Sequence, residues 1–459
     1  MPTLAWACDT LGSSRPGLDP ETLLGPISID TRSLHKGDTF WALSGARDGH
    51  DFVEAAFDKG AKLAVVNEDW WRDRAMRHTN RPAICVKDTR TALTRLGMAW
   101  RLRWTNSVVG ITGTNGKTST KDLMLILLAL KFRTAGTTGN LNNELGVPLT
   151  MLSIGSDTEI AVVEMGASHP GEIGTLCKIC LPTHGLVTSI GKAHLEGFGS
   201  TQAIAQTKGE LYEAVADNGV AFVPTDDELC RIEAQDNRTK IGFGFQARPL
   251  SWSAEFHQAT DLRYDDQGCA AFSFEGTEIR LSIPGKPAAM TALAALTTAD
   301  HFGIPPQSCR EPMRSWKGVH ARVDVLRVGG VTIIDDSYNA NPSSMLTALE
   351  TLSLLPGRRH IAILGDMNEL GEFADAEHRQ LGSAMSQYPL VRVVFVGSLS
   401  KLAADSATAS GVSCSHFATF EELAPEILGL VKSGDVILVK GSRGGRLERV
   451  VQLLTDTLA

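Results

Sequence analysis

The sequence predicts an α/β protein of three domains. The chain has 459 residues, a length that corresponds to roughly two to four domains. Short apolar strands alternate with helical stretches in its middle and again in its last third, which is typical of parallel sheets covered by helices. We therefore expect a small α/β N-terminal domain at 1–104, a central domain with a parallel sheet at 105–312, entered through a linker at 104–107, and a C-terminal Rossmann-like domain at 313–459.

The composition is that of an ordinary globular protein and excludes several function classes. Hydrophobic residues make up 43% of the chain and charged residues 21%. The net charge of −8 argues against non-specific nucleic-acid binding and means that local cations must hold any anionic substrate. The 8 cysteines are too sparse for a disulfide framework. Because neither a secretory signal nor an apolar run of about 18 residues is present, we expect a cytoplasmic enzyme without a membrane span. We also expect a monomer.

The N-terminal domain contains short alternating elements. The Lys-Gly-Asp turn at 36–38 precedes a strand expected at 39–43, and a polar loop follows at 47–51. A helix is expected at 52–59, before Gly60, and then a strand at 63–66. The polar loops are consistent with ligand binding, but polar residues are also ordinary in loops.

The central domain begins with the most informative stretch of the chain, a strand, a glycine loop and a helix. An apolar run at 108–111 predicts a buried strand, and Gly113 and Gly116 allow a tight turn close to a ligand. A helix follows Lys117-Thr118, with an apolar face expected at Leu123, Ile126, Leu127 and Leu130. Strand, glycine loop, Lys-Thr and helix together predict a phosphate-binding loop and an ATPase domain. Because the strict motif has glycine where this chain has Ile111, the loop is a shorter form, and an ordinary strand-to-helix turn is the alternative.

Two further strands of this domain are followed by polar side chains. A strand at 160–163 leads into Glu164, and a strand expected at 186–190 leads to His194. Because ligands bind at the carboxyl ends of the strands in such sheets, both residues belong near the phosphate loop. A carboxylate there is a natural Mg²⁺ ligand. For His194 alone, a structural role is an equal alternative.

Two other features of the central domain have open interpretations. Asn140, Asn142 and Asn143 form a loop dense in amide groups, which suits either ligand binding or turn formation. Ser200 is placed to cap a helix from Thr201, on which Lys208 shares the apolar face of Ile204, Leu211 and Val215. Lysine is seldom buried without a partner, so a surface lysine that extends to solvent is the alternative there.

The C-terminal domain repeats the same arrangement of strands and polar strand ends. Strands are expected at 331–334, 361–364, 393–396 and 436–439, each followed by glycine or polar residues. Function is therefore expected at the carboxyl edge of this sheet as well. A Gly-x-Gly-x-x-Gly motif is absent, so the sequence does not indicate a dinucleotide.

These motifs in this order resemble the Mur ligases of peptidoglycan synthesis over essentially the whole chain. The resemblance implies an ATP site made by Gly113, Thr114, Asn115, Gly116, Lys117, Thr118, Arg322, Asp336 and Asn339. It implies ligands for two Mg²⁺ ions at Thr118, Glu164, His194 and Lys208, the last as a carbamate. The catalytic residues implied are Lys117, Glu164, His194 and Lys208.

Four stretches, 139–143, 335–342, 365–371 and 440–443, resemble the family members that join D-alanyl-D-alanine to UDP-N-acetylmuramoyl-tripeptide. The resemblance implies substrate binding by Asp30, Thr31, Arg32, Ser44, Gly45, Asn140, Asn142, Asn143 and Tyr338, with the first five at the uridine diphosphate end. The chain departs from the family pattern around the adenine, where amide-bearing side chains are replaced by Pro224, Pro287, Ala288 and Thr291.

The implied activity is ATP-dependent amide formation through an acyl phosphate. Folylpolyglutamate synthetases share such an ATPase unit and are an alternative, which the stretches 28–50 and 335–342 disfavour. A nucleotide-binding protein without ligase chemistry is a second alternative. The sequence leaves open whether the third residue of the tripeptide is meso-diaminopimelate or lysine.

Overall fold

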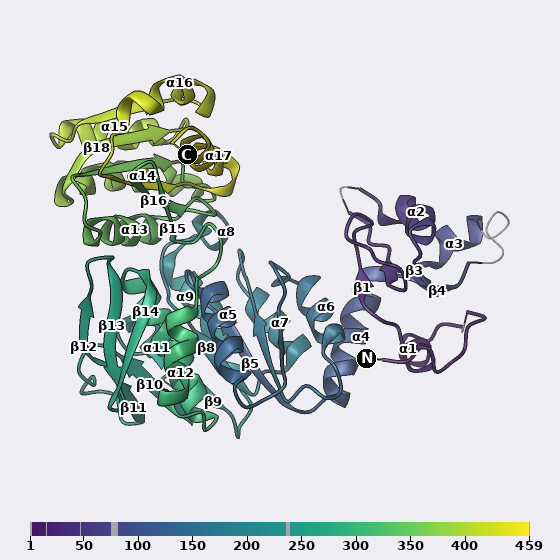
Figure 1. Cartoon of the computed structure of the whole chain (residues 1–459). Coiled ribbons are helices and arrows are strands. Elements are labelled where there is room, and N and C mark those ends of the chain that lie inside the picture. Colours follow the sequence, from purple (N-terminus) through teal and green to yellow (C-terminus); the bar gives the residue numbers. More distant parts are fainter. Residues whose placement is uncertain (1, 15, 46, 75–80, 236–238, 459) are drawn as a thin grey trace.

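The computed structural model describes residues 2–14, 16–45, 47–74, 81–235 and 239–458. The chain forms mixed α/β units, with the C-terminal unit above the central one and the N-terminal unit to its side (Figure 1), and most of its sheet strands are parallel. Among the described residues, no helix is long and apolar enough to cross a membrane.

The N-terminal part carries a four-stranded parallel sheet of order β1-β2-β3-β4. Its strands are β1 (Ile27–Ser28), β2 (Thr39–Trp41), β3 (Leu63–Asn67) and β4 (Ala83–Val86). Its helices are α1 (Leu4–Leu11), η1 (Gly49–Phe52), α2 (Val53–Asp58), α3 (Glu68–Arg74) and α4 (Thr89–Arg103). The expected strand at 39–43 ends two residues earlier, and the expected helix at 52–59 is divided between η1 and α2.

The central part is a doubly wound sheet of seven parallel strands in the order β11-β10-β9-β8-β5-β7-β6. The strands are β5 (Ser107–Thr112), β6 (Thr134–Gly136), β7 (Ile160–Glu164), β8 (His184–Val187), β9 (Val220–Pro224), β10 (Lys240–Gly244) and β11 (Glu255–Gln258). The helices of its first half are α5 (Lys117–Leu128), α6 (Gly146–Ser153), α7 (Glu172–Cys180), α8 (Leu195–Phe198), α9 (Thr201–Glu213) and α10 (Glu228–Glu233). The inner strands are rich in Val and Ile because both faces of the sheet are buried.

A smaller antiparallel sheet follows, formed by β12 (Thr260–Tyr264), β13 (Cys269–Phe274) and β14 (Thr277–Pro284). It shares an apolar core with α11 (Lys286–His301) and α5. The next helix, α12 (Pro306–Ser315), packs on α11 and β14, so the domain limit expected between residues 312 and 313 falls inside a helix. The expected linker at 104–107 also differs, because Trp104 is buried in the core and Ser107 begins β5.

The buried face of α5 differs from the face expected from the sequence. Its buried apolar residues are Leu123, Met124, Leu127 and Leu128. Ile126 and Leu130, which were expected on that face, are 41% and 46% exposed. The helix packs against both β7 and α11, so the buried stripe is turned toward the groove between them.

The C-terminal part is a six-stranded sheet of order β15-β16-β20-β17-β18-β19, in which only the edge strand β15 is antiparallel. The strands are β15 (Asp324–Val328), β16 (Val331–Asp336), β17 (Arg359–Gly365), β18 (Leu390–Val396), β19 (Cys414–Phe417) and β20 (Asp435–Lys440). The main helices are α13 (Pro342–Leu354), α14 (Ala374–Ala384), α15 (Ser400–Ala409), α16 (Phe420–Leu430) and α17 (Glu448–Leu458). All strands expected here are present, as a Rossmann-like sheet.

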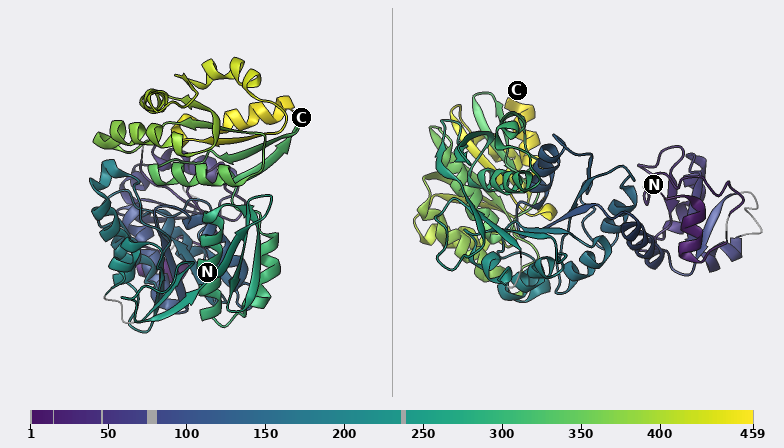
Figure 2. Two further views of the ribbon diagram at one scale, coloured as in Figure 1. Left: turned by 90° about the vertical axis from the view of Figure 1, so that its left-hand side faces the viewer. Right: turned by 90° about the horizontal axis from the view of Figure 1, so that it is seen from below.

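The three parts are not equally close to one another. The C-terminal sheet sits directly on the central part, whereas the N-terminal sheet extends away from both (Figure 2). The connection to the N-terminal sheet is α4, which packs against α1 on one side and against α6 and α7 on the other. The carboxyl edge of the central sheet faces the C-terminal part, since Asn115, in the loop after β5, accepts a hydrogen bond from Asn341, just before α13.

Candidate active site

The phosphate loop lies between β5 and α5, at the carboxyl edge of the central sheet. β5 pairs with β7 on one side and β8 on the other, which aligns Ile111 with Glu164 and Thr112 with Val187. Gly113 has φ +146° and approaches β8 so closely that a Cβ would lie 2.0 Å from Thr188 Oγ1. The loop therefore requires glycine there, and α5 begins at Lys117 with its free N–H groups at the loop.

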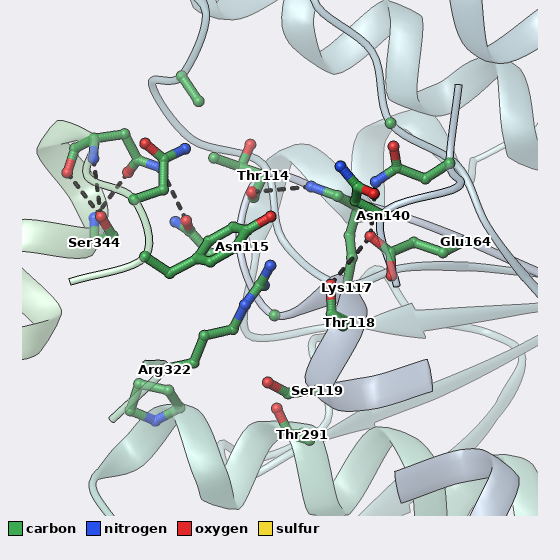
Figure 3. Close-up of a pocket in the computed structure, with 18 of the residues that line it drawn as sticks. Thr114, Asn115, Lys117, Thr118, Ser119, Asn140, Glu164, Thr291, Arg322 and Ser344 are labelled. Atoms are coloured by element: carbon green, nitrogen blue, oxygen red, sulfur yellow. Dashed lines mark hydrogen bonds between the residues drawn. The ribbon is translucent and has the colours of Figure 1, made fainter. Parts of the chain in front are cut away.

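Hydrogen bonds hold the loop in shape. Thr114 N donates to Ser189 O at 2.8 Å, and Thr114 Oγ1 donates to Gly191 O at 3.1 Å. Lys117 Nζ folds back to donate to Gly113 O at 2.6 Å and to Thr114 O at 3.3 Å, the second of which is drawn in Figure 3. Burial lowers the pKa of Lys117 to about 8, with the nearby charge of Arg322 acting in the same direction.

Glu164 ends β7 with its side chain beside the loop. Its Oε1 accepts from Thr118 Oγ1 at 3.1 Å and from Asn142 Nδ2 at 2.9 Å. Its Oε2 is buried and has no hydrogen-bond partner. A buried carboxylate oxygen without a donor is costly, so this atom marks a position suited to a cation.

The structure brings His194 and Lys208 to the same region from two other elements. β8 ends at Val187 instead of 190, and the following loop carries His194 to the start of α8. As expected, Ser200 caps α9, whose Lys208 side chain is directed inward and only 3% exposed. Burial lowers the pKa of Lys208 to about 7, and the charge of Lys117 acts in the same direction. Burial also lowers the pKa of His194, against the opposing effect of Glu369.

The three asparagines of the amide loop have different positions. Asn142 holds Glu164, as described above. Asn143 Oδ1 accepts from Gly146 N at 2.9 Å, so its amide supports the turn into α6. Asn140 lines the cavity described below, as do the other two. The structure therefore shows a turn-forming role for Asn143, and ligand binding by this loop stays a prediction.

The C-terminal part completes the site. The guanidinium carbon of Arg322 lies 4.3 Å from the centre of the Tyr338 ring. Lys440 Nζ donates to Asp336 Oδ2 at 2.5 Å and to Asn339 O at 2.9 Å. Burial raises the pKa of Asp336, and the adjacent Lys440 opposes this rise. Figure 3 shows Arg322 extending from this part toward the phosphate loop.

A cavity of about 770 Å³ connects these residues. It is lined by all predicted ATP-site residues except Gly113, and also by Glu164, His194 and Tyr338. Pro287, Ala288 and Thr291 line it from α11, whereas Pro224 does not. Lys208 does not line the cavity in the described chain, but its charge helps to lower the pKa of His194, and the charge of Lys117 helps to lower the pKa of Lys208.

The residues expected at the uridine diphosphate end lie outside this cavity. Asp30, Thr31 and Arg32 form an exposed turn in which Arg32 pairs with Asp30 at 2.6 Å and holds the pKa of its carboxyl at about 2. The Ser44-Gly45 turn is linked to the cavity indirectly. Arg90 donates to Ser44 O at 3.1 Å and pairs with Glu144, a cavity residue, at 3.2 Å.

The residues around the loop fit Mg²⁺ that is shared with a nucleotide. Thr118 and Glu164 offer oxygen atoms, and Glu164 Oε2 has no other partner. The described residues contain no group of three or more His, Cys, Asp or Glu side chains arranged for a metal. Mg²⁺ commonly takes only one or two carboxylates and completes its shell with phosphate oxygens and water, so this donor set suits it.

Sequence reasoning missed Arg90, Glu144 and Glu369 as members of the site. Lys440 and Glu369 lie in stretches singled out for their resemblance, without a role assigned to either side chain. Arg90 lies on a helix with no motif around it. Its part depends on a contact between distant segments, which no local pattern marks.

Comparison with known proteins agrees with this geometry. The family model of the Mur ligase middle domain matches residues 111–299, and that of the Mur ligase glutamate ligase domain matches residues 321–443. UDP-N-acetylmuramoyl-tripeptide–D-alanyl-D-alanine ligase of Escherichia coli (strain K12) is 34% identical over 99% of this chain and 98% of its own length. The enzyme of that name in Bacillus subtilis (strain 168) is 33% identical over 95% of this chain and 94% of its own.

Solved structures show the same fold. A crystal structure of MurF from Acinetobacter baumannii superposes with a TM-score of 0.86 at 30% identity, covering 99% of this chain and 98% of that one. MurF ligase of Thermotoga maritima in complex with ADP gives a TM-score of 0.79 at 30% identity, covering 95% and 98%. The chain therefore belongs to the Mur ligase family.

Proposed function

We propose that this chain is the ATP-dependent peptide ligase that joins D-alanyl-D-alanine to UDP-N-acetylmuramoyl-tripeptide. The observation that carries the proposal is the shared cavity, where the phosphate loop and Glu164 of the central part face Arg322 and Asp336 of the C-terminal part. The activity named for relatives that match nearly the full chain supports the same substrates. As the amide bond forms, ATP is converted to ADP and phosphate.

In the first step the tripeptide carboxylate becomes an acyl phosphate. One carboxylate oxygen attacks the γ-phosphorus of ATP, the bond between that phosphorus and the β-γ bridging oxygen breaks, and ADP leaves. The N–H groups at the start of α5 bind phosphate oxygens, and Lys117 adds positive charge. Arg322 lines the same cavity from the C-terminal part, which supports a role for its charge in binding these phosphates.

In the second step the amine of D-alanyl-D-alanine attacks the acyl carbonyl. A tetrahedral intermediate forms, the nitrogen loses a proton, and phosphate leaves as the new amide bond is completed. Holding both substrates between two parts of the chain supplies proximity, and closing the cavity excludes water that would hydrolyse the acyl phosphate. Asp30, Thr31, Arg32, Ser44 and Gly45 would hold the distant uridine diphosphate end, and Asn140, Asn142, Asn143 and Tyr338 the peptide end.

The metal ligands we propose are Thr118, Glu164, His194 and Lys208, the last as a carbamate. When bound, two Mg²⁺ ions supply positive charge that offsets the repulsion between ATP and the substrate carboxylate. The burial of Lys208 on the inward face of α9 supports its assignment as a metal ligand. Within the described chain it forms no ion pair with a carboxylate, so it is available for modification.

The proposed reaction is tested by measuring phosphate release with purified protein, ATP and Mg²⁺. Release is expected only when UDP-N-acetylmuramoyl-tripeptide and D-alanyl-D-alanine are both present, and mass spectrometry should show the joined product. Tripeptides ending in meso-diaminopimelate and in lysine are compared in parallel. Equal turnover with folate and glutamate would favour the folylpolyglutamate synthetase alternative, and ATP binding without product would favour the non-catalytic one.

We also propose that the enzyme acts as a cytoplasmic monomer, because all residues assigned above come from one chain and ATP is a cytoplasmic substrate. For the domains, we propose limits near residues 104 and 316, the second moved past α12 so that no helix is divided. Light scattering after gel filtration measures the mass of the protein in solution. A monomer should give 49.3 kDa, and a dimer would give twice that mass. Limited proteolysis tests the limits.

A further inference from the structure

Glu369 reaches the candidate metal site from the C-terminal part of the chain. It lies on the loop after β17, and its Oε2 is 2.5 Å from His194 Nδ1. Its main-chain oxygen also accepts a hydrogen bond from Glu196 N at 3.1 Å. Glu369 thus contacts the turn at His194 twice, from a different sheet.

The backbones of both turns are shaped for this contact. His194 has φ 52° and Glu369 has φ 61°, a left-handed conformation that few residues other than glycine adopt. At Gly371 a Cβ would lie 3.1 Å from Glu196 Cα, tighter than most contacts of that kind, so the small residue allows the two turns to meet. Such strain is maintained only where the surrounding structure holds it.

The contact decides which nitrogen of His194 is free. A neutral imidazole has one N–H and one nitrogen with a lone pair. A carboxylate beside Nδ1 favours the proton on that nitrogen and leaves Nε2 to coordinate a metal, an arrangement common at metal-binding histidines. His194 Nδ1 and Glu369 Oε2 are 2.5 Å apart, although the contact does not have the geometry of a regular hydrogen bond.

We propose that Glu369 is a positioning residue that fixes the tautomer and orientation of His194. Because Glu369 belongs to the C-terminal part, His194 becomes an effective metal ligand only when that part is docked on the central one. Metal affinity and docking are therefore coupled. The inference rests on the proposed metal role of His194, and the experiment below separates the two.

The first measurement is Mn²⁺ binding to the full-length chain with ADP present, followed by electron paramagnetic resonance. Glu369→Ala should weaken Mn²⁺ binding about 10-fold to 100-fold, the range typical when the carboxylate partner of a ligating histidine is lost. Glu372→Ala is the matched control, because Glu372 is exposed, lies on the same loop, and has no hydrogen bond or ion pair in the described chain. Its affinity should stay within about twofold of the wild type.

The double variant with His194→Ala makes the interpretation specific. If Glu369 acts through His194, adding Glu369→Ala to His194→Ala should weaken Mn²⁺ binding no further. If the double variant instead lost the sum of the Mn²⁺ binding energies lost in the two single variants, the inference would be overturned. A His194→Ala variant with wild-type affinity would instead overturn the metal role of His194 itself. Weakening by His194→Ala but not by Glu369→Ala would overturn the positioning role alone.

A spectroscopic measurement excludes a merely structural role. In protein labelled with ¹⁵N at histidine, His194 should show a single tautomer with its proton on Nδ1, and Glu369→Ala should give a mixture. Lys192→Ala is the control, since it removes another contact between the same two parts, the pair with Glu377 at 2.5 Å, without touching His194. An unchanged tautomer in Glu369→Ala, or an equal change in Lys192→Ala, would contradict the proposal.

Discussion

Replacement of Lys208 tests the proposed carbamate most directly. The side chain is 3% exposed, and burial together with Lys117 lowers its pKa from 10.5 to about 7. At pH 7 about half of such amines are neutral, compared with roughly one in three thousand for a free lysine. Only the neutral amine reacts with CO₂, so the fold makes this amine about a thousandfold more available. Carbamate formation then replaces a positive charge with a negative one beside the metal ligands.

We therefore expect Lys208→Ala to lower the rate of phosphate release by at least about a hundredfold, the size of effect seen when one charge-stabilising group is removed from an active site. Acetate should restore part of that activity by supplying a carboxylate. Lys208→Arg should not be restored, because guanidinium keeps its charge and does not form the carbamate. Lys178→Ala, at an exposed position, is the control and should behave as wild type.

The modification itself is measured by ¹³C nuclear magnetic resonance with labelled bicarbonate, on protein loaded with Mg²⁺ and ADP. The wild type should show a carbamate carbon signal that is missing from Lys208→Ala. Full activity in Lys208→Arg, or a loaded wild type without the signal, would refute the reasoning. An unloaded sample is unsuitable, because without metal the carbamate loses the ligand bonds that stabilise it.

Three other predictions concern separate parts of the structure. Lys117→Ala should lower the rate by about a hundredfold to a thousandfold while the circular dichroism spectrum stays unchanged, and normal turnover would exclude this loop as the phosphate site. Because Pro287, Ala288 and Thr291 line the cavity without amide groups, GTP should support turnover at a rate close to that of ATP; strong preference for ATP would show that other groups read the base. Burial and the adjacent His301 lower the pKa of His184 to about 4. In the unfolded chain the His184 imidazole gains a proton below about pH 6.5, whereas in the folded chain it stays neutral down to about pH 4. The free energy of unfolding is therefore highest above pH 6.5 and falls by about 2 kcal/mol at pH 5. Hydrogen exchange of β8 amides should show this loss, and an equal loss in His184→Gln would contradict it.

The strand ends of the central sheet could be predicted from the sequence, and the reason is physical. A strand buried on both faces must be apolar, so the first polar residues after it mark the exposed edge of the sheet. The sequence alone therefore places Glu164 and His194 near the phosphate loop. The face of α5 could not be predicted in this way. Residues 123–128 are all apolar, so the pattern contains no preferred stripe, and contacts with β7 and α11 select one.

Contacts between distant parts of the chain could not be predicted from the sequence, for a different reason. Glu369, Arg90 and Glu144 have charged side chains, which are mostly exposed to solvent in proteins, and no residue type or spacing marks them as members of a site. Their positions matter only because folded elements far apart in the chain meet there. The expected domain limit at 312 depends on such packing too, since Pro312 suggests a break in the sequence but lies within α12. Proline in a helix removes one hydrogen bond, and packing on β14 offsets that cost.

The cavity is divided between two parts of the chain, and this division explains how substrates gain access. Apolar packing joins the parts through α13 on α11, through α8 on η2 (Gly371–Phe373) and through a shared apolar cluster. Polar contacts join them as well, among them Asn115 with Asn341 at 2.9 Å and Lys192 with Glu377 at 2.5 Å. Each such contact contributes only about 1 kcal/mol, because water replaces it on opening. Differential binding of ATP and peptide substrates, which touch both walls, can supply energy of that size and favour the closed form. We therefore expect bound substrates to stabilise the closed arrangement of the two parts, in which water is kept from the acyl phosphate.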